Sequence, residues 1–267
     1  MSTDGVTAEP LILFETDANG VATLTLNRPA KYNAFTQEMV IQWAEALDRA
    51  GEDPNVRAII VTGAGKAFCS GGDVGNMAKR TEEDALQRKD YLYRYVHRVA
   101  FAMERLDKPV IAAINGAARG AGLDMALMCD IRYMAQSATV AESYINMGFI
   151  SGDGGAWYLP RLIGIDQALE LFWTGRVVGA EEAKAMGLVT RIVPDEDLMP
   201  AARELATKIA SQPTAAVRMF KRAVYQGMTT SLHAHLDLVS SHMSVLRDSP
   251  EHKERVRAFL ERPRKSK

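Results

Sequence analysis

The chain has 267 residues, of which 47% are apolar and 24% are charged, and its formal net charge at pH 7 is −1. This length is enough for one large buried core, or for one core with an appended helical piece. A net charge near zero argues against nucleic acid or an anionic membrane surface as the main partner, and no apolar run reaches the length of a membrane span.

The two cysteines, Cys69 and Cys129, are too few for a disulfide framework and fit a reducing compartment, so we expect a cytoplasmic protein. The five histidines show no metal-ligand spacing with cysteines or acidic residues, so no metal site is expected.

The order of the predicted elements indicates an α/β protein with a helical C-terminal region. Alternating apolar residues predict a β-hairpin over residues 11–26, with Asn19 and Gly20 at its turn, and Thr36 is a suitable N-cap for a helix that reaches about Ala50. Strands alternate with helices up to about residue 195, which predicts a layered core over residues 11–195 and a helical region over residues 196–267. The other expected elements, in chain order, are a strand at 58–61, a small-residue loop at 63–75, a charged helix at 82–106, a strand at 109–114, a bend at 116–122 that leads into a helix, strands at 129–134 and 139–142, a glycine-rich bend at 148–155, short strands up to 188–193, and helices at 201–211, 214–226, 232–246 and 252–261.

The stretch from Ile114 to Asp130 combines a strand, a tight small-residue turn and the start of a helix. The first N–H groups of a helix have no intrahelical partner and lie at the positive end of its dipole, so this place favours a negative charge. A dinucleotide fingerprint is excluded because Met125 stands where its third glycine belongs, and a phosphate loop because Ile60 stands where its first glycine belongs. The turn is therefore expected to serve a carbonyl oxygen; the alternative is that its glycines only permit close packing of the helix.

Several short motifs follow one another along the chain at characteristic separations. They are LNRP at 26–29 with NAF at 33–35, KAFCSGGD at 66–73, PVIAAING at 109–116 with GAG at 120–122, CDIRY at 129–133, the stretch 183–189, and AFLER at 258–262. In this order they resemble the enoyl-CoA hydratase/isomerase (crotonase) superfamily, from about residue 11 to the end of the chain.

The resemblance implies a crotonase-like spiral of ββα turns, with the C-terminal helical region forming homotrimers or dimers of trimers and closing the CoA pocket. It also implies an acyl-CoA thioester as the substrate, with coenzyme A as part of that substrate and no separate cofactor. The shared chemistry is an enolate stabilised by two backbone N–H donors, which by position are Gly72 and Ala121. The family usually has glycine where Ala121 stands, and alanine keeps the N–H group.

The same resemblance places the adenine and phosphate parts of CoA along the backbone from Lys66 to Gly71. Three cationic side chains are candidates for contacts with CoA, namely Arg28, Lys31 and Arg262. The alternative is that they are ordinary charged residues of the surface. Cys69 has no histidine nearby in the sequence and is not expected to be a nucleophile. The full set of candidate CoA contacts is Arg28, Lys31, Ala34, Lys66, Ala67, Phe68, Ser70, Gly71, Asp73 and Arg262.

The acid–base residues depart from the hydratase pattern. Hydratases of the superfamily carry two glutamates that activate one water, and this chain has Asp124 and Tyr144 at those positions. Tyrosine, with a reference pKa of about 10, is a poor base at neutral pH. Asp153 is a candidate replacement, because isomerases of the superfamily use an aspartate of the same bend, one residue earlier; Glu142 is a weaker candidate. The alternatives are a helix-dipole partner for Asp124 and a turn former for Asp153.

The leading hypothesis is an enzyme that moves a proton at the α or γ carbon of an acyl-CoA, either a hydratase with an altered acid pair or a double-bond isomerase. Residues 75–95 are expected to form the acyl wall, and His97 is interpreted as a helix-surface residue. A thioester or carbon–carbon hydrolase of the same superfamily is an alternative. So is a non-catalytic crotonase-fold binding protein, although the basic residues of 82–106 are interleaved with acidic ones and form no cationic stripe.

Overall fold

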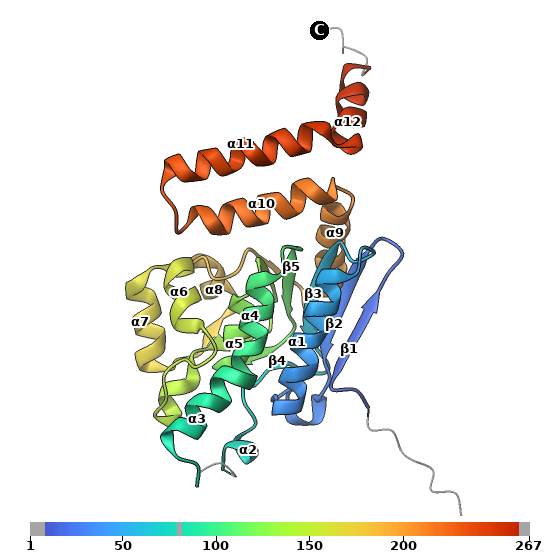
Figure 1. Ribbon diagram of the computed structural model, residues 1–267. Helices are drawn as coiled ribbons and strands as arrows, with labels where there is room; N and C mark the ends of the chain where they lie inside the picture. The colour runs from blue at the N-terminus through green and yellow to red at the C-terminus, as the bar shows by residue number, and fades with distance from the viewer. Residues whose placement is uncertain (1–8, 79–81, 262–267) are drawn as a thin grey trace, which may run out of the picture.

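The computed structural model describes residues 9–78 and 82–261, and in it two β-sheets are wound into one spiral (Figure 1). The larger sheet has the order β1-β2-β3-β5-β7-β10; β1 and β2 are antiparallel, and every later neighbour is parallel. Its strands are β1 (Ile12–Thr16), β2 (Val21–Leu26), β3 (Ala58–Gly63), β5 (Val110–Ile114), β7 (Ile131–Ala135) and β10 (Arg191–Val193).

The smaller sheet has the order β4-β6-β8-β9, with β4, β6 and β8 parallel and β9 antiparallel to β8. Its strands are β4 (Ala67–Cys69), β6 (Ala117–Arg119), β8 (Thr139–Ala141) and β9 (Val178–Gly179). The first turn contributes β1 and β2 to the larger sheet, and the next three, β3–β4, β5–β6 and β7–β8, each add one strand to the larger sheet and one to the smaller sheet before helical segments follow. The ββα spiral expected from the sequence is confirmed.

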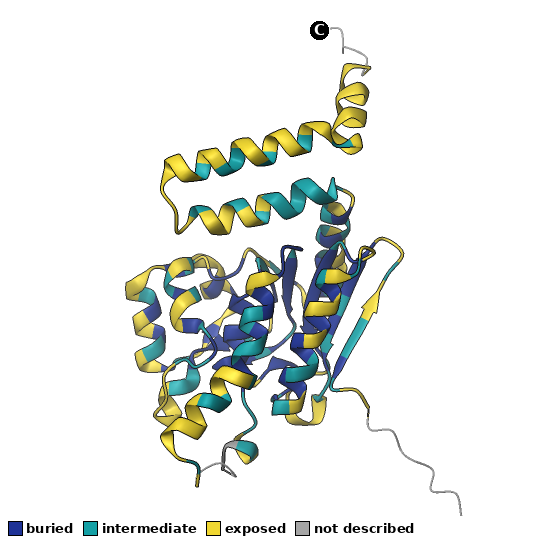
Figure 2. Ribbon diagram, viewed as in Figure 1, coloured by how far each residue is buried: buried dark blue, intermediate teal, exposed yellow. Residues whose placement is uncertain are grey.

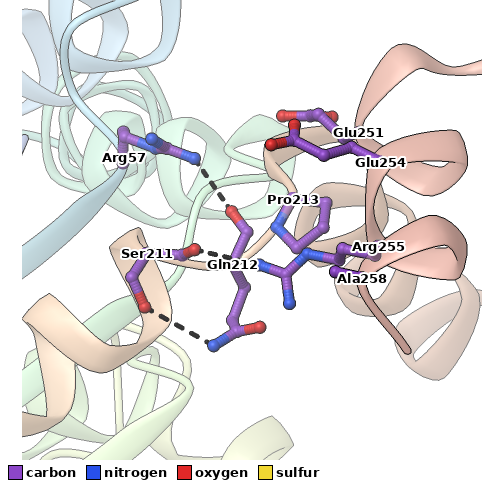
Figure 3. A pocket seen from close by; sticks show the side chains of 8 residues that line it. All are labelled: Arg57, Ser211, Gln212, Pro213, Glu251, Glu254, Arg255 and Ala258. Carbon is purple, nitrogen blue, oxygen red and sulfur yellow. Dashed lines mark hydrogen bonds between the residues drawn. The ribbon is translucent and has the colours of Figure 1, made fainter. Parts of the chain in front are cut away.

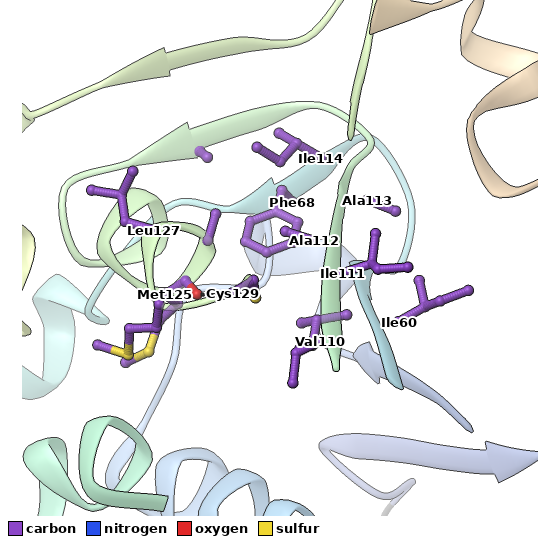
Figure 4. Packing of buried hydrophobic residues seen from close by; sticks show 14 of the residues in the cluster. Ile60, Phe68, Val110, Ile111, Ala112, Ala113, Ile114, Met125, Leu127 and Cys129 are labelled. Atoms are coloured by element: carbon purple, nitrogen blue, oxygen red, sulfur yellow. Dashed lines mark hydrogen bonds between the residues drawn. The ribbon is translucent and has the colours of Figure 1, made fainter. Parts of the chain in front are cut away.

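The core is built from strands that are apolar on both faces, as is usual for parallel sheets. Every residue of β3 and β5 is buried, and Ile60 and Ile111 of these strands belong to the same buried cluster as Phe68 of β4 and Leu127 of α5. Figure 4 shows Phe68 between Leu127 and Ile111. Helix α1 (Gln37–Glu52) begins where Thr36 caps it by accepting a hydrogen bond from the Met39 amide, and it buries Trp43 and Leu47.

The helices that follow the strands carry the site and its surroundings. They are α2 (Val74–Ala78), α3 (Ala85–Tyr91), a π-helical turn (Leu92–Val96), α4 (His97–Arg105), α5 (Ala121–Leu127), α6 (Gly155–Ile163), α7 (Ile165–Thr174) and α8 (Ala180–Ala185), with 3₁₀ turns η1 (Pro29–Lys31), η3 (Ser143–Met147) and η4 (Asp195–Asp197).

Two sequence predictions were wrong at this level. The loop predicted at 63–75 contains strand β4, and the bend predicted at 116–122 contains strand β6. Both strands are only three residues long and consist mainly of small side chains, so neither shows the alternation by which a strand is recognised.

The last helices leave the core. Helix α9 (Leu198–Ala210) buries Leu198, Ala202, Ala206 and Ala210 and packs on β2, β3, β5 and β7. In contrast, α10 (Thr214–Gly227), α11 (Leu232–Asp248) and α12 (Pro250–Leu260) project outward, and all their residues are exposed or half-buried (Figure 2). We call these three helices the arm. The division of the chain at residue 196 stays a prediction.

The arm is attached through polar contacts. Asp107 accepts hydrogen bonds from Arg218, at 2.7 Å, and from Arg222, and Asp130 accepts from Lys221 and Tyr225, both at 2.8 Å. A cavity of about 390 Å³ lies between the α9–α10 connection and α12, where Arg57 donates to the carbonyl of Gln212 at 2.8 Å and Arg255 to that of Ser211 at 3.2 Å (Figure 3). No helix within the described ranges is long and apolar enough to cross a membrane.

Candidate active site

Two backbone amides that the sequence singles out are free to bind a ligand. Gly72 pairs with Phe35 in an isolated parallel bridge. In this bridge the Phe35 amide donates to the carbonyl of Gly71, and the Phe35 carbonyl accepts from the amide of Asp73. The amide of Gly72, which lies between these two bonds, therefore points away from Phe35. Ala121 is the first residue of α5, where amides have no intrahelical acceptor. Within residues 9–78 and 82–261, neither amide donates a hydrogen bond.

Glycines bring these two amides close together. Gly71 has φ of +93°, and a Cβ there would lie 2.9 Å from the carbonyl of Arg119 and 3.6 Å from the amide of Ala121. A Cβ at Gly122 would lie only 2.1 Å from the carbonyl of Cys69. The end of β4 and the start of α5 therefore approach each other at backbone contact distance, which glycine alone allows.

A cluster of carboxyl and hydroxyl groups lies beside the start of α5. The Tyr144 hydroxyl is 2.7 Å from Oδ2 of Asp124 and 2.8 Å from Oδ2 of Asp153, and the Ser151 hydroxyl donates to Oδ2 of Asp124 at 2.8 Å. These side chains come from three segments: Asp124 from α5, Tyr144 from η3, and Ser151 and Asp153 from the bend before α6. The structure thus brings together Asp124, Tyr144 and Asp153, the acid–base candidates named from the sequence.

Burial controls the protonation of this cluster, because Asp124 and Glu142 are 0% exposed and Asp153 is 6% exposed. Burial and the neighbouring charge of Asp124 raise the pKa of Asp153 to about 7 and that of Glu142 to about 10. Burial also raises the pKa of Asp124, but the hydroxyls of Tyr144 and Ser151 oppose this rise by donating to its carboxylate.

Two residues of the cluster, Glu142 and Ser151, were not among the leading acid–base candidates from the sequence. Glu142, the weaker sequence candidate, lies within hydrogen-bonding reach of Asp124 when it is protonated. Ser151 was missed; the only sequence signal is a hydroxyl two positions before Asp153 in the same glycine-rich bend.

His97 proves to be more than a helix-surface residue, which corrects the sequence interpretation. Its side chain is half-buried, and Nε2 is 2.8 Å from the carbonyl of Gly152, the neighbour of Asp153. Because a carbonyl only accepts, Nε2 carries the proton. His97 follows a π-helical turn, a feature often found at functional sites, and its ring packs edge-on against Tyr93 and Phe101.

The candidate CoA contacts differ in what they can offer to a ligand. The guanidinium of Arg28 is engaged by Oδ2 of Asp73 at 3.1 Å and by the carbonyl of Ala34. Lys31, Lys66 and Ser70 are exposed, Ala34 and Asp73 are half-buried, Ala67, Phe68 and Gly71 are buried, and Arg262 lies outside the described residues.

Asn33 organises this region and was named in the sequence only as part of a motif. It is fully buried, its Oδ1 accepts from the Arg28 amide at 2.9 Å, and its Nδ2 donates to the carbonyls of Ala64 and Ala67 at 2.9 and 2.8 Å.

Burial raises the pKa of Cys69 to about 12, so this side chain is a thiol and a poor nucleophile. The described residues contain no group of three or more acidic, histidine or cysteine side chains placed to hold a metal ion, and the metal expectation stays a prediction.

A ββα spiral with two free amides at a strand–helix junction and a buried carboxyl cluster beside them defines a crotonase-fold enzyme. The chain belongs to the enoyl-CoA hydratase/isomerase family, whose model matches residues 16–266. It is therefore an enzyme that acts on an acyl-CoA by hydration or double-bond isomerisation, and the leading hypothesis from the sequence is confirmed at this level.

Relatives that are named as an isomerase and as a hydratase both align along nearly the whole chain. The chain is 36% identical over 241 residues to the 1,2-epoxyphenylacetyl-CoA isomerase of Escherichia coli, covering 90% of this chain and 92% of that one. It is 34% identical over 245 residues to the crotonyl-CoA hydratase of Syntrophomonas wolfei, covering 91% and 92%. A crystal structure of an enoyl-CoA hydratase from Mycobacterium smegmatis superposes with a TM-score of 0.89 at 36% identity, covering 96% of this chain and 99% of that one.

Proposed function

We propose that the enzyme is a double-bond isomerase that converts a 3-enoyl-CoA into a 2-enoyl-CoA through an enolate. The observation that carries this proposal is the direct contact of the Tyr144 hydroxyl with Asp124 at 2.7 Å and with Asp153 at 2.8 Å. A hydratase needs two carboxylates that hold a water between them, and here a phenol occupies the second place and bonds directly to the first carboxyl. Isomerisation needs no such water.

The proposed reaction uses the two aspartates in opposite states. The Asp124 carboxylate removes a proton from Cα, and the negative charge that appears on the thioester oxygen is stabilised by the amides of Gly72 and Ala121. The Asp153 carboxylic acid then gives a proton to Cγ, and the double bond forms between Cα and Cβ. This assignment is supported by the hydroxyls of Tyr144 and Ser151, which both approach Oδ2 of Asp124 and favour its charged form, whereas Asp153 is approached by Tyr144 alone.

The acyl group is proposed to lie against an aromatic row on the π-helical turn and α4, formed by Tyr93, His97 and Phe101. Their rings stack edge-on with centroids 5.6 to 6.2 Å apart, and Tyr93 is 62% exposed. Because His97 contacts Gly152, this row adjoins the bend that carries Asp153. The name of the E. coli relative, which specifies a phenylacetyl group, supports an acyl group with a ring.

Assembly into trimers or dimers of trimers remains part of the proposal. It is supported by large apolar side chains on the arm that a single chain leaves exposed, among them Phe220, Leu232, Leu236 and Phe259. We also propose that the enzyme needs no cofactor besides the CoA of its substrate, and that it works in the cytoplasm, where its two free cysteines stay reduced.

The test compares a 3-enoyl-CoA with crotonyl-CoA and follows the absorbance of the conjugated thioester. An isomerase raises the absorbance from the first substrate, and a hydratase lowers it from the second. Asp124→Asn and Asp153→Asn should each reduce isomerisation by about 10²- to 10⁴-fold. Asp195→Asn, a surface carboxyl bonded to Ser137, is the control. Faster hydration of crotonyl-CoA, or release of free CoA thiol, would refute the proposal.

A further inference from the structure

The contacts of the Tyr144 hydroxyl with two carboxyls determine how many hydrogens these three groups must carry together. A phenol carries one hydrogen and can donate it to one acceptor. Its oxygen is nevertheless 2.7 Å from Oδ2 of Asp124 and 2.8 Å from Oδ2 of Asp153, both within the range of O–H···O hydrogen bonds. If both carboxyls were ionised, one of these contacts would bring two acceptors together without a hydrogen. One aspartate must therefore be a carboxylic acid that donates to the Tyr144 oxygen.

The surroundings determine which aspartate carries the hydrogen. Oδ2 of Asp124 also accepts from the Ser151 hydroxyl at 2.8 Å, so two hydroxyls point at the same oxygen, which is best satisfied as a carboxylate. Tyr144 is the one side chain among the described residues that bonds to Asp153. The two hydrogen bonds therefore point in the same direction, from Asp153 toward Asp124: the Asp153 acid donates to the Tyr144 oxygen, and the Tyr144 hydroxyl donates to the Asp124 carboxylate.

One turnover of the proposed reaction reverses the protonation states of Asp124 and Asp153. Asp124 has gained the proton from Cα and Asp153 has lost its proton to Cγ, so neither group can begin a second cycle. Exchange with water is hindered, because Asp124 is 0% exposed and Asp153 is 6% exposed. Glu142, also 0% exposed, offers no route to solvent.

We propose that Tyr144 is a proton relay that restores the starting protonation of Asp124 and Asp153 after each double-bond shift. Asp124 passes its proton to the Tyr144 oxygen while the proton of the Tyr144 hydroxyl moves to Asp153. One O–H bond breaks and one forms at Tyr144, no charge is left on it, and the aspartates exchange their states. This role rests on the proposed isomerase function and adds to it the step that makes the cycle repeatable.

The relay predicts a separation between the first turnover and the later ones. In Tyr144→Phe both aspartates remain but Asp124 loses one of its two hydroxyl donors, so the rate of a single turnover with enzyme in excess should fall less than the rate of steady-state turnover. Steady-state turnover should fall by about 10²-fold, the size of a lost general acid–base contribution, and progress curves should show a burst. A small buffer acid such as imidazole should restore part of the steady-state rate of Tyr144→Phe and leave that of the wild type unchanged.

The matched control is Tyr158→Phe. Tyr158 is half-buried and packs against Gly154 in the same bend, but among the described residues no hydrogen bond joins its hydroxyl to Asp124 or Asp153. It should show no burst. Equal loss of single-turnover and steady-state rates in Tyr144→Phe would overturn the relay, because it would indicate a positioning role alone. An unchanged steady-state rate would overturn it as well. Absence of isomerisation in the wild type would instead refute the proposed function.

A second measurement does not depend on how Tyr144→Phe folds. Infrared spectra of the wild type labelled with ¹³C in its aspartate carboxyls should show the carbonyl stretch of a protonated aspartic acid at neutral pH. The label separates this band from that of Glu142. The band should be absent in Asp153→Asn and remain in Asp195→Asn. A wild type without the band would overturn the assignment of protons on which the relay depends.

Discussion

At the scale of single residues, Asp153 can act as an acid only while it keeps its proton, and burial together with the charge of Asp124 holds its pKa at about 7. The acid form is present below this value and is lost as the pH rises through it. We therefore expect kcat/KM for isomerisation to decline above about pH 7. At low pH the rate should also fall, because Asp124, whose pKa is raised by burial, must be ionised.

A pH profile of kcat/KM checks this. In Asp153→Asn the small residual activity should lack the decline above pH 7, since asparagine does not titrate. A decline that persists unchanged in this variant would assign it to another group.

Glu142 gives a prediction about stability. Burial and the charge of Asp124 raise its pKa from 4.5 to about 10. A carboxyl whose pKa is higher in the folded state stabilises fully below its unfolded pKa, and this contribution is lost as the pH rises toward the folded value. Between pH 5 and pH 9, thermal unfolding midpoints of the wild type should therefore fall more steeply than those of Glu142→Gln. Glu45→Gln, at an exposed position of α1, should keep the wild-type slope.

The sequence was informative about which residues form the site and uninformative about how they connect. The motif positions pointed to Asp124, Tyr144 and Asp153. That Tyr144 bridges the aspartates depends on η3, the 3₁₀ turn that begins at Ser143, directly after the predicted strand at 139–142. The pKa values of these groups depend on burial, which requires the packed structure.

At the scale of elements, the close approach of β4 and α5 depends on Gly122. Its Cβ would lie 2.1 Å from the carbonyl of Cys69, so Gly122→Ala must push the two segments apart. Overpacking of this kind costs typically about 1–3 kcal/mol, and it should also displace the Ala121 amide, so activity should fall together with the unfolding temperature. Gly179→Ala is the control, because open space surrounds Gly179. Normal activity of Gly122→Ala would contradict the placement of the amide pair.

The link between α4 and the Asp153 bend depends on His97. Replacing it with Phe keeps the ring contacts with Tyr93 and Phe101 but removes the donor to the Gly152 carbonyl. Losing one such hydrogen bond costs about 0.5–1.5 kcal/mol, so we expect kcat to fall several-fold with a smaller change in KM. His97→Gln retains an N–H donor and should recover part of kcat. Equal rates for both variants would show that the hydrogen bond does not position Asp153.

Longer elements were predictable from the sequence, and the short strands were not. The hairpin at 11–26 and the helix from Thr36 have clear periodicity and turn or cap residues, and both are confirmed. Strands β4 and β6 owe their existence to pairing with each other across the spiral, between Ala67 and Ala117 and between Cys69 and Ala118. That pairing is a tertiary contact, which local pattern does not contain.

At the scale of the whole molecule, the exposed apolar residues of the arm predict its behaviour in solution. Leu236→Glu places a charge on a face that the proposed trimer covers, and it should shift the sedimentation coefficient to a smaller species. Asp237→Asn, at the adjacent exposed position, should leave the assembly unchanged. A wild type that sediments as a monomer would refute the proposed assembly.

The direction of the arm could not be predicted from the sequence. The helices themselves follow from their periodicity and from Ser231 and Ser249 as N-caps. Their attachment depends on Asp107 meeting Arg218 and on Asp130 meeting Lys221, pairs that are about a hundred residues apart in the chain. Nothing local to either partner specifies such a pairing.

The polar attachment of the arm sets an order of events during synthesis. Every strand among the described residues, and the helix α9 that covers the larger sheet, precedes α10 in the chain, so the core can close while the last helices are still inside the ribosome. The arm then docks on a finished surface by forming charged contacts, and its exposed apolar side is the part that the proposed trimer would cover. In the proposed assembly, maturation therefore has two stages, and only the second depends on the concentration of the protein in the cell.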